Sequence, residues 1–235
     1  MSHPRGQEIV GLRDVTRTFP ACVTYRRRHD NPLIGFVEGF AFIAGIGDVS
    51  YIKRVAPNAK LSLFTSFAFY GPRVHEQADW VVNLLLNDRD TRRAVIVLPN
   101  MDEVLEDRPC TTSLQYQITN MVELHVTVNM RSSDAVWGLP YDLTQFNLFS
   151  TMIARCVGCD LVDITLMIGN AHIYTAIGER VVDAAWVPGK VFTPWSFEVP
   201  FDGITTEAWR TWARYEIKNV THSELVSDWK FKEEK

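Results

Sequence analysis

The spacing of hydrophobic and polar positions divides the first hundred residues into helical and extended segments. Residues 34–45 are apolar almost throughout and too short to cross a membrane, which predicts a buried helix. Residues 61–71 indicate a strand or extended chain that ends at a Gly-Pro turn. Residues 75–93 have apolar residues at helical spacing and predict an amphipathic helix. Residues 93–99 are β-branched and end at a proline, which predicts a strand.

The middle of the chain shows the clearest change of period. Residues 111–134 alternate around Asn120 and predict two paired strands joined by a short turn. Asp142 stands where a helix N-cap is expected, ahead of apolar residues at helical spacing. Residues 163–176 predict a further strand. Helices and strands alternate without a regular βαβ repeat, and this pattern predicts the α+β class.

The remaining segments give weaker patterns. Residues 24–33 read as a basic loop, and the periodicity is weak after about residue 185. There is no internal repeat, low-complexity tract or Gly/Ser-rich linker. We therefore expect a single domain over residues 1–235.

Composition narrows the class of protein. The 235 residues are 46% hydrophobic and 22% charged, with a net charge of -4. This balance does not favour general nucleic-acid binding, although clustered arginines can hold a small anion. No secretory signal or membrane-spanning run is visible. Four cysteines without a signal are expected to be thiols, which predicts a cytoplasmic protein in a reducing compartment.

Two kinds of cysteine site are distinguished by their surroundings. Cys110 begins a predicted strand near Arg108, where a thiol can act as a nucleophile; the alternative is a buried structural cysteine. Cys156 and Cys159 form a CxxC pair at the end of an apolar helix. Since no second CxxC or HxxxH completes four ligands, we expect packing and no metal site.

Several polar residues also allow two interpretations. Glu38 stands alone among hydrophobics, so it is either a buried acid–base group with a shifted pKa or a solvated residue at a rim. His172 and Tyr174 alternate along a strand and face the same side, as ligands for a hydroxyl or as core residues. The pairs Arg92-Arg93 and Arg131-Ser132 are either a phosphate cluster or surface positions.

Taken in order, these pieces resemble the thymidylate synthase family over roughly residues 5 to 177. VEGFAFIAG is similar to the helix that carries the family's catalytic glutamate, and YGPRV is similar to its Tyr-Gly turn. The most specific matches are DTRRAVIVLP, RPCTTSLQYQI, NMRSSDAVWGLPYDL and GNAHIY.

The resemblance implies a mixed β-sheet with flanking helices, and a homodimer whose sheets pack back to back. In such a dimer, Arg92 and Arg93 reach the nucleotide phosphate of the partner subunit's site. Arg131 and Ser132 hold the same 5′-phosphate within their own subunit. Arg5 is a weaker candidate for this cluster.

The resemblance also assigns roles in chemistry. It implies that Cys110 attacks C6 of a pyrimidine nucleotide, that Glu38 organises proton transfer through water, and that Tyr70 belongs to the catalytic group. The one-carbon donor is 5,10-methylenetetrahydrofolate, whose pterin ring contacts Asp134, with Trp137 on the same side.

Within the GNAHIY segment, the resemblance implies that His172 and Tyr174 bind the sugar hydroxyl. Asn170 stands in the same segment as a substrate-binding candidate, where the family usually has an aspartate.

Asp142 departs from the pattern of the uracil-specific synthases, which carry asparagine at this position. An amide complements O4 and N3–H of uracil, whereas a carboxyl accepts from the cytosine amino group and shares a proton with N3. A wrong pairing leaves buried polar groups unsatisfied, at about 1–3 kcal/mol per group. Asp142 and NMRSSDAVWG resemble the cytidylate hydroxymethylases of the family.

A second departure lies between residues 46 and 66, where the family's tryptophan-rich folate segment is missing. If water reaches the exocyclic methylene of the nucleotide, the product is a hydroxymethyl group and tetrahydrofolate leaves unoxidised. The sequence therefore favours 5-hydroxymethylation of CMP or dCMP. The alternatives are reductive methylation of dUMP or dCMP and, from another class, a non-catalytic nucleotide-binding homodimer.

Overall fold

The computed structural model describes residues 8–21, 23–26, 31, 33–59, 70–99, 108–176, 187–191 and 205–220. The expected contribution of Arg5, and residues 61–69 of the expected strand at 61–71, lie outside the described residues.

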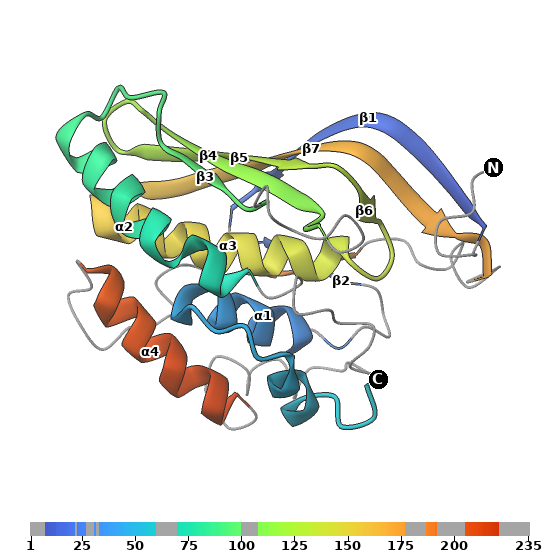
Figure 1. The fold of residues 1–235 in the computed structure, drawn as a ribbon. Helices are drawn as coiled ribbons and strands as arrows, with labels where there is room; N and C mark the ends of the chain where they lie inside the picture. Colours follow the sequence, from blue (N-terminus) through green and yellow to red (C-terminus); the bar gives the residue numbers. More distant parts are fainter. Residues whose placement is uncertain are drawn as a thin grey trace.

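A mixed β-sheet of six strands forms one layer of the molecule (Figure 1). Its strands follow the order β1-β7-β5-β4-β3, and β6 pairs with β7. The pairs β5·β7 and β6·β7 are parallel, and the other pairs are antiparallel. The strands are β1 Ile9–Pro20, β3 Val95–Val97, β4 Thr111–Thr119, β5 Glu123–Met130, β6 Ser133–Asp134 and β7 Asp160–Tyr174. A separate pair joins β2 (Val23–Arg26) to β8 (Val187–Val191).

The hairpin of β4 and β5 follows the alternation expected around Asn120. Alternate residues of β5 are buried, as a strand covered on one face requires. Asn120 and Met121 adopt positive φ angles of 48° and 65°, which turn the chain tightly between the two strands. The two paired strands are therefore confirmed.

The helices lie together on one side of the sheet (Figure 1). Helices α2 and α3 lie beneath the strands, and α1 and α4 lie on the far side of α3. The interleaved helices and strands confirm the α+β class. The helices are α1 Leu33–Ala44, the short 3-10 helix η2 Val49–Arg54, α2 Gly71–Asn87, α3 Leu139–Val157 and α4 Thr206–Asn219. Among the described residues, no helix is long and apolar enough to cross a membrane.

Helix α1 confirms the buried helix expected over residues 34–45. Every residue from Ile34 to Ala44 is buried. Gly35 and Gly39 allow close approach to α3, because a side chain at either position would collide with Thr144 or Leu148. This close packing brings the polar positions of α1 and α3 near one another.

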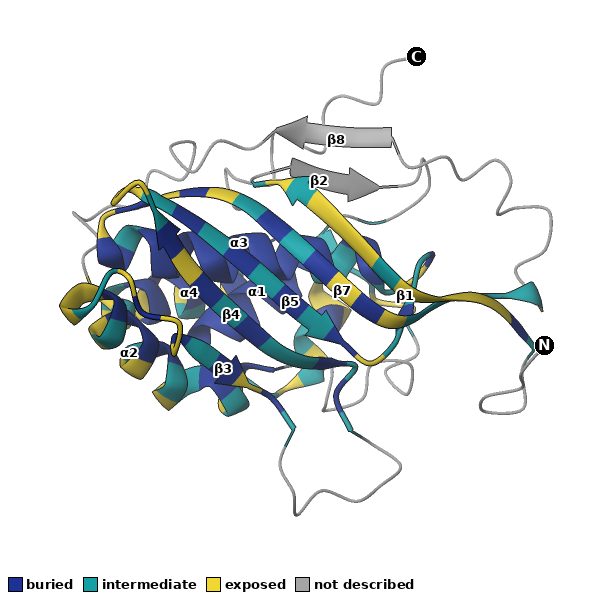
Figure 2. Ribbon diagram, turned by 90° about the horizontal axis from the view of Figure 1, so that it is seen from above, coloured by how far each residue is buried: buried dark blue, intermediate teal, exposed yellow. Residues whose placement is uncertain are grey.

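The opposite face of the sheet carries alternating exposed side chains (Figure 2). Leu12 in β1 is 70% exposed and Met167 in β7 is 45% exposed. The described helices all lie on the other face. We call this the open face of the sheet.

Two expected helices begin earlier in the structure than predicted. Helix α2 begins at Gly71, not residue 75, and ends at Asn87. Pro72 occupies its first turn, where a proline needs no hydrogen-bonding N–H, so the expected Gly-Pro turn is a helix start. Helix α3 begins at Leu139 with Gly138 as its N-cap. The prediction that Asp142 caps this helix is therefore wrong, since Asp142 lies inside the first turn.

Other elements did not follow from the sequence patterns. Strand β1 was not expected, and residues 24–26 belong to β2, so the predicted loop over 24–33 is wrong at its start. The expected strand over 93–99 shortens to β3. Helix α4 lies where the periodicity looked weak, and its N-cap Thr205 accepts a hydrogen bond from the backbone N of Ala208 at 3.3 Å.

Candidate functional site

Cys110 lies immediately before β4, at the end of the sheet nearest the start of β6. The thiol residue is half-buried, not enclosed in the core. The backbone N–H of Arg131 donates to the carbonyl oxygen of Cys110 at 2.8 Å. One residue further, the hydroxyl of Thr111 donates to the phenol oxygen of Tyr70 at 3.2 Å. The backbone thus fixes Cys110 beside a phenol.

Tyr70 precedes α2 and is only 4% exposed. Burial raises the pKa of its phenol, and the nearby charges of Asp142 and Cys110 raise it further. Its ring packs edge-on against Phe42 of α1, with ring centroids 5.7 Å apart. Tyr70 therefore remains a protonated, immobile hydrogen-bond donor near the thiol.

Glu38 lies on α1 and is 7% exposed, so it is not a solvated residue at a rim. Burial raises the pKa of its carboxyl well above the ordinary value, and the carboxylate of Asp142 raises it further. Glu38 therefore keeps its proton to a higher pH than an exposed glutamate. Such a group is suited to proton transfer.

Asp142 is partly buried in the first turn of α3. Its Oδ1 accepts a hydrogen bond from Nε2 of Gln145 at 2.8 Å. Burial raises the pKa of Asp142 to about 7, with a smaller increase from Asp134, while the bond from Gln145 opposes the shift. The carboxyl can therefore be neutral or charged near neutral pH.

The structure brings four of the expected catalytic residues together. The charge of Cys110 acts on Tyr70, and that of Asp142 acts on both Tyr70 and Glu38. We call Cys110, Tyr70, Glu38 and Asp142 the thiol–carboxyl group. It combines a nucleophile, a fixed hydrogen-bond donor and two carboxyls whose pKa values are raised. Within the described residues, no salt bridge involves either carboxyl.

Arg131 supports the segment that carries Cys110. Its Nε donates to the carbonyl of Pro109 at 3.0 Å, and its Nη2 donates to the carbonyl of Arg108 at 2.7 Å. The side chain is otherwise exposed, and Ser132 follows it with intermediate exposure. Arg131 thus places a positive charge beside the thiol and orients its loop.

Arg92 and Arg93 lie elsewhere. Both are exposed, and Arg93 forms an ion pair with Asp88 at 3.3 Å. The sheet register places Val95 opposite Gln115, so the two arginines lie towards the end of β4 remote from Cys110. Continued to Arg93, this register reaches Gln117, seven residues from Cys110, which corresponds to roughly 23 Å of strand. Within one chain, they do not join the thiol–carboxyl group.

The end of β7 carries the expected sugar-binding residues. His172 is 8% exposed, and its ring packs edge-on against Tyr174 with centroids 5.3 Å apart, which confirms that both face one side. The side-chain oxygen of Asn170 is buried and has no hydrogen-bond partner in the part of the chain that the structure describes. Pairing of β6 with β7 places Asp134 opposite His172. These residues therefore lie next to the Arg131–Asp134 segment.

Asp134 shapes the turn before α3. Its Oδ1 accepts hydrogen bonds from the backbone N–H groups of Val136 at 2.8 Å and Trp137 at 3.2 Å. This turn presents Trp137, which is 54% exposed. An exposed indole and a carboxyl close to Asp142 suit a flat heterocycle, because the ring can stack while the carboxyl pairs with its N–H groups.

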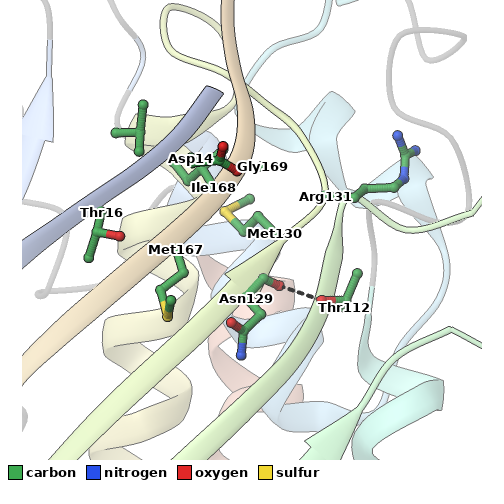
Figure 3. A pocket seen from close by; sticks show the side chains of 10 residues that line it. Asp14, Thr16, Thr112, Asn129, Met130, Arg131, Met167, Ile168 and Gly169 are labelled. Atoms are coloured by element: carbon green, nitrogen blue, oxygen red, sulfur yellow. Dashed lines mark hydrogen bonds between the residues drawn. The ribbon is translucent and has the colours of Figure 1, made fainter. Parts of the chain in front are cut away.

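A pocket of about 300 Å³ opens between the middle of β1 and of β7, the start of β4 and the end of β5. Figure 3 shows the guanidinium of Arg131 pointing away from the other labelled side chains. The lining includes the exposed Thr16 and Met167 but no member of the thiol–carboxyl group. This pocket therefore lies on the open face and is separate from the thiol–carboxyl group.

The other described cysteines behave as expected. Cys156 is 2% exposed and Cys159 is 6% exposed, so both pack in the core as free thiols. Burial raises the pKa of Cys156 to about 12. In the described part of the chain, no group of three or more His, Cys, Asp or Glu residues is arranged to hold a metal ion.

Gln145 and Thr111 were not expected from the sequence. Gln145 is 2% exposed and stands three residues after Asp142, which places both on one side of a helix. The only available signal was this spacing of a polar side chain within an apolar helix. Thr111 contacts Tyr70 across 41 residues, which local patterns do not reveal.

Comparison with known proteins gives a consistent family. The family model described as "Thymidylate synthase" matches residues 57–185. Thymidylate synthase of Bacillus atrophaeus is 32% identical over 102 residues, covering 43% of this chain and 44% of that protein. Thymidylate synthase 1 of Bacillus subtilis (strain 168) is also 32% identical over 102 residues, covering 43% of this chain and 36% of its own length.

A phage relative extends over more of the chain. Deoxyuridylate hydroxymethyltransferase of Pseudomonas phage M6 is 26% identical over 174 residues, covering 68% of this chain and 50% of that protein. The matched segments thus span half or less of these relatives' own lengths.

Proposed function

Because the chain belongs to the thymidylate synthase family of one-carbon transferases, we propose that it is a folate-dependent cytidylate 5-hydroxymethyltransferase. It would convert CMP or dCMP, 5,10-methylenetetrahydrofolate and water to the 5-hydroxymethyl nucleotide and tetrahydrofolate. The observation that carries this proposal is Asp142, a partly buried carboxyl with its pKa raised to about 7 beside the catalytic thiol.

Asp142 would read the base. As a neutral acid it donates to N3 of cytosine, and its other oxygen accepts from the amino group. The raised pKa supports this role, because an ordinary aspartate would be charged at neutral pH and would lack the proton for N3. A base with the reverse pattern leaves buried polar atoms unpaired.

The thiol–carboxyl group would perform the substitution at C5. The thiolate of Cys110 adds to C6, and C5 of the ring becomes nucleophilic. Tyr70 stays protonated and donates a fixed hydrogen bond, while Glu38 holds or releases a proton through water. Loss of the C5 proton and release of Cys110 from C6 regenerate the aromatic ring.

Binding of the nucleotide would use the residues around Cys110. Arg131 and Ser132 would hold the phosphate, and His172, Tyr174 and Asn170 would contact the sugar. The buried, unpartnered oxygen of Asn170 supports this assignment, because a sugar hydroxyl would satisfy it.

A second copy of the chain would complete the phosphate site with Arg92 and Arg93. The two arginines are exposed and far from Cys110 of their own chain. The open face, with exposed Leu12 and Met167, would be the surface that packs against the second copy. Arg5 remains a further candidate for the phosphate cluster.

The folate would occupy the side of Asp134 and Trp137. The exposed indole of Trp137 offers a stacking surface, and one oxygen of Asp134 is not used by the turn described above. When bound, this cosubstrate supplies a one-carbon unit at the oxidation level of formaldehyde. Addition of water to the one-carbon unit on C5 then gives the hydroxymethyl product without oxidation of the folate. The relative from Pseudomonas phage M6 supports this outcome within the family, because its name states a hydroxymethyltransferase.

A second candidate is transfer to dUMP. The names of the Bacillus relatives favour reductive methylation, and that of the phage relative favours hydroxymethylation of deoxyuridylate. In its charged form Asp142 has no donor for uracil O4, whereas in its neutral form it pairs with uracil only when its proton lies on the oxygen that faces O4.

The test is to incubate the protein with methylenetetrahydrofolate and CMP, dCMP or dUMP, and to weigh the nucleotide products by mass spectrometry. We expect a gain of CH₂O on a cytosine nucleotide with no rise in dihydrofolate absorbance. A gain of CH₂ together with dihydrofolate would contradict hydroxymethylation. Conversion of dUMP alone would contradict the cytosine preference.

A further inference from the structure

Gln145 is the closest described partner of the base-reading carboxyl. It is 2% exposed, and Nε2 of its amide donates to Oδ1 of Asp142 at 2.8 Å. Its Oε1 is buried and has no hydrogen-bond partner among the described residues. A buried acceptor that is left unsatisfied costs about 1–3 kcal/mol of stability. We therefore expect a bound ligand to donate a hydrogen bond to this oxygen.

We propose that Gln145 is a specificity-determining positioning residue: it keeps the proton of Asp142 on Oδ2 and supplies a second acceptor for the cytosine amino group. This inference rests on the proposed reading of the base by Asp142. It adds the residue that determines which oxygen of the Asp142 carboxyl carries the proton and which one accepts.

A neutral carboxylic acid alone does not discriminate well between the two bases. Its proton can sit on either oxygen, so it can present the donor and acceptor order that suits cytosine or the order that suits uracil. The N–H of Gln145 removes this freedom, because Oδ1 must accept and the proton is then held on Oδ2. Oδ2–H faces N3 of cytosine, and Oδ1 accepts from the amino group.

The Oε1 atom of Gln145 also favours cytosine over uracil. The two ends of an amide are separated by just over 2 Å, so Oε1 lies within about 5 Å of Oδ1. An acceptor at this place attracts the amino group of cytosine and repels O4 of uracil. Discrimination thus comes from an attraction to one base and a repulsion of the other.

The bond from Gln145 also lowers the pKa of Asp142 against the larger effect of burial. Removal of the amide therefore raises the pKa of Asp142 further above its ordinary value. The pH at which nucleotide binding weakens, through loss of the proton, then moves upward. This shift follows from the hydrogen bond and not from general stability.

The variants are Gln145→Met, which keeps the volume and removes both polar atoms, and Gln145→Glu, which keeps an acceptor and removes the donor at a pH where the new carboxyl is ionised. Asn147→Leu is the control, because it removes another fully buried amide from α3 that bonds to the carbonyl of Leu143. Calorimetry would measure the dissociation constants of dCMP and dUMP against pH, and thermal melting would identify folded variants.

We expect the preference for dCMP over dUMP to fall about tenfold in Gln145→Met, equivalent to about 1.4 kcal/mol. The midpoint of the pH profile should rise, with neither change in Asn147→Leu. An unchanged ratio and midpoint in a folded Gln145→Met or Gln145→Glu protein would overturn the inference.

The ratio of the dissociation constants for dCMP and dUMP in the wild-type protein tests the proposed function separately from this inference. A wild-type protein that prefers dUMP would contradict the cytosine proposal. In that case, an upward pH shift in Gln145→Met would still establish that Gln145 controls the proton of Asp142.

Discussion

Two regions of the molecule differ in how their acidic side chains are buried and paired. On the helix side, burial raises the pKa of Glu38 and of Asp142, and the carboxylate of Asp142 also raises the pKa of Glu38 and Tyr70. Among the described residues, neither carboxyl forms a salt bridge. On the open face, His125 Nδ1 pairs with Asp163 at 2.9 Å, and its Nε2 lies 3.0 Å from the hydroxyl of Thr119. The second arrangement is a satisfied surface network, whereas the first is unfavourable when charged.

The difference indicates which region carries chemistry. Acidic groups that are buried near one another lower stability whenever both are charged, so folding alone does not favour them. Their occurrence beside a half-buried thiol is the arrangement expected of acid–base catalysis. The open face lacks such strain and suits association between subunits.

The largest expected effect comes from the thiol. Cys110→Ser should lower turnover of the cytosine nucleotide by about 10³-fold or more, because a hydroxyl is a far weaker nucleophile at neutral pH. Cys159→Ser is the matched control in the core and should retain turnover once its folding is verified. Full turnover by Cys110→Ser would contradict the assignment of Cys110 as the nucleophile, whereas absence of turnover in the wild-type protein would favour the non-catalytic homodimer.

The next effect concerns the proposed contact between subunits. Arg92→Ala/Arg93→Ala should lose most activity, about 10²-fold, through a raised KM for the nucleotide. Mixed with inactive Cys110→Ser under conditions that exchange subunits, it should recover about a quarter of wild-type activity, since half the dimers carry one intact site. No recovery, despite exchange verified by mass spectrometry, would argue against a site shared between subunits.

Stability should depend on pH through Asp142. Its pKa in the folded state, about 7, exceeds the ordinary value of 3.8, so the folded protein holds this proton more tightly. The free energy of unfolding therefore falls as pH rises from about 4 to 7. Asp142→Asn should remove this loss and stabilise the protein by on the order of 2 kcal/mol above neutral pH.

Urea unfolding of both proteins across this pH range would measure the effect. Asp163→Asn on the open face is the control, because Asp163 already has a histidine partner. Parallel pH profiles for wild-type and Asp142→Asn proteins would show that Asp142 does not hold a proton in the folded state.

The smallest effect is expected for the ion pair on the open face. The side chains of His125 and Asp163 are 31% and 25% exposed, so solvent screens their attraction. A double-mutant cycle with His125→Gln and Asp163→Asn should give about 0.2–1 kcal/mol. We expect this pair at the solvated rim of the proposed subunit contact. A coupling several times larger in the dimer would contradict that placement, because it would show that the pair is desolvated.

The elements that followed from the sequence were those with a strong local pattern. The β4–β5 hairpin was predictable because its apolar positions alternate, and the α1 helix because its segment is apolar almost throughout. Strand β1 was not, since Arg13, Asp14 and Arg17 interrupt its pattern and most of its residues are exposed on both sides of the strand. Local pattern shows a strand only when one face is buried along its length.

The same limit applies to the site. Cys110 and Glu38 stood out as unusual residues in their segments, but the burial of Glu38 depends on packing of α1 against α3. Asp142 was placed at a helix cap because Pro140 was not read as part of the helix. The role of Gln145 depends on the direction of one amide, which no spacing rule provides.

The most direct test of the account is the ratio of kcat/KM for dCMP over dUMP in wild-type and Asp142→Asn proteins. The wild-type ratio should exceed one, and the substitution should lower it at least about tenfold, because the amide complements O4 and N3–H of uracil. An unchanged ratio in a folded Asp142→Asn protein would contradict the claim that this carboxyl reads the base.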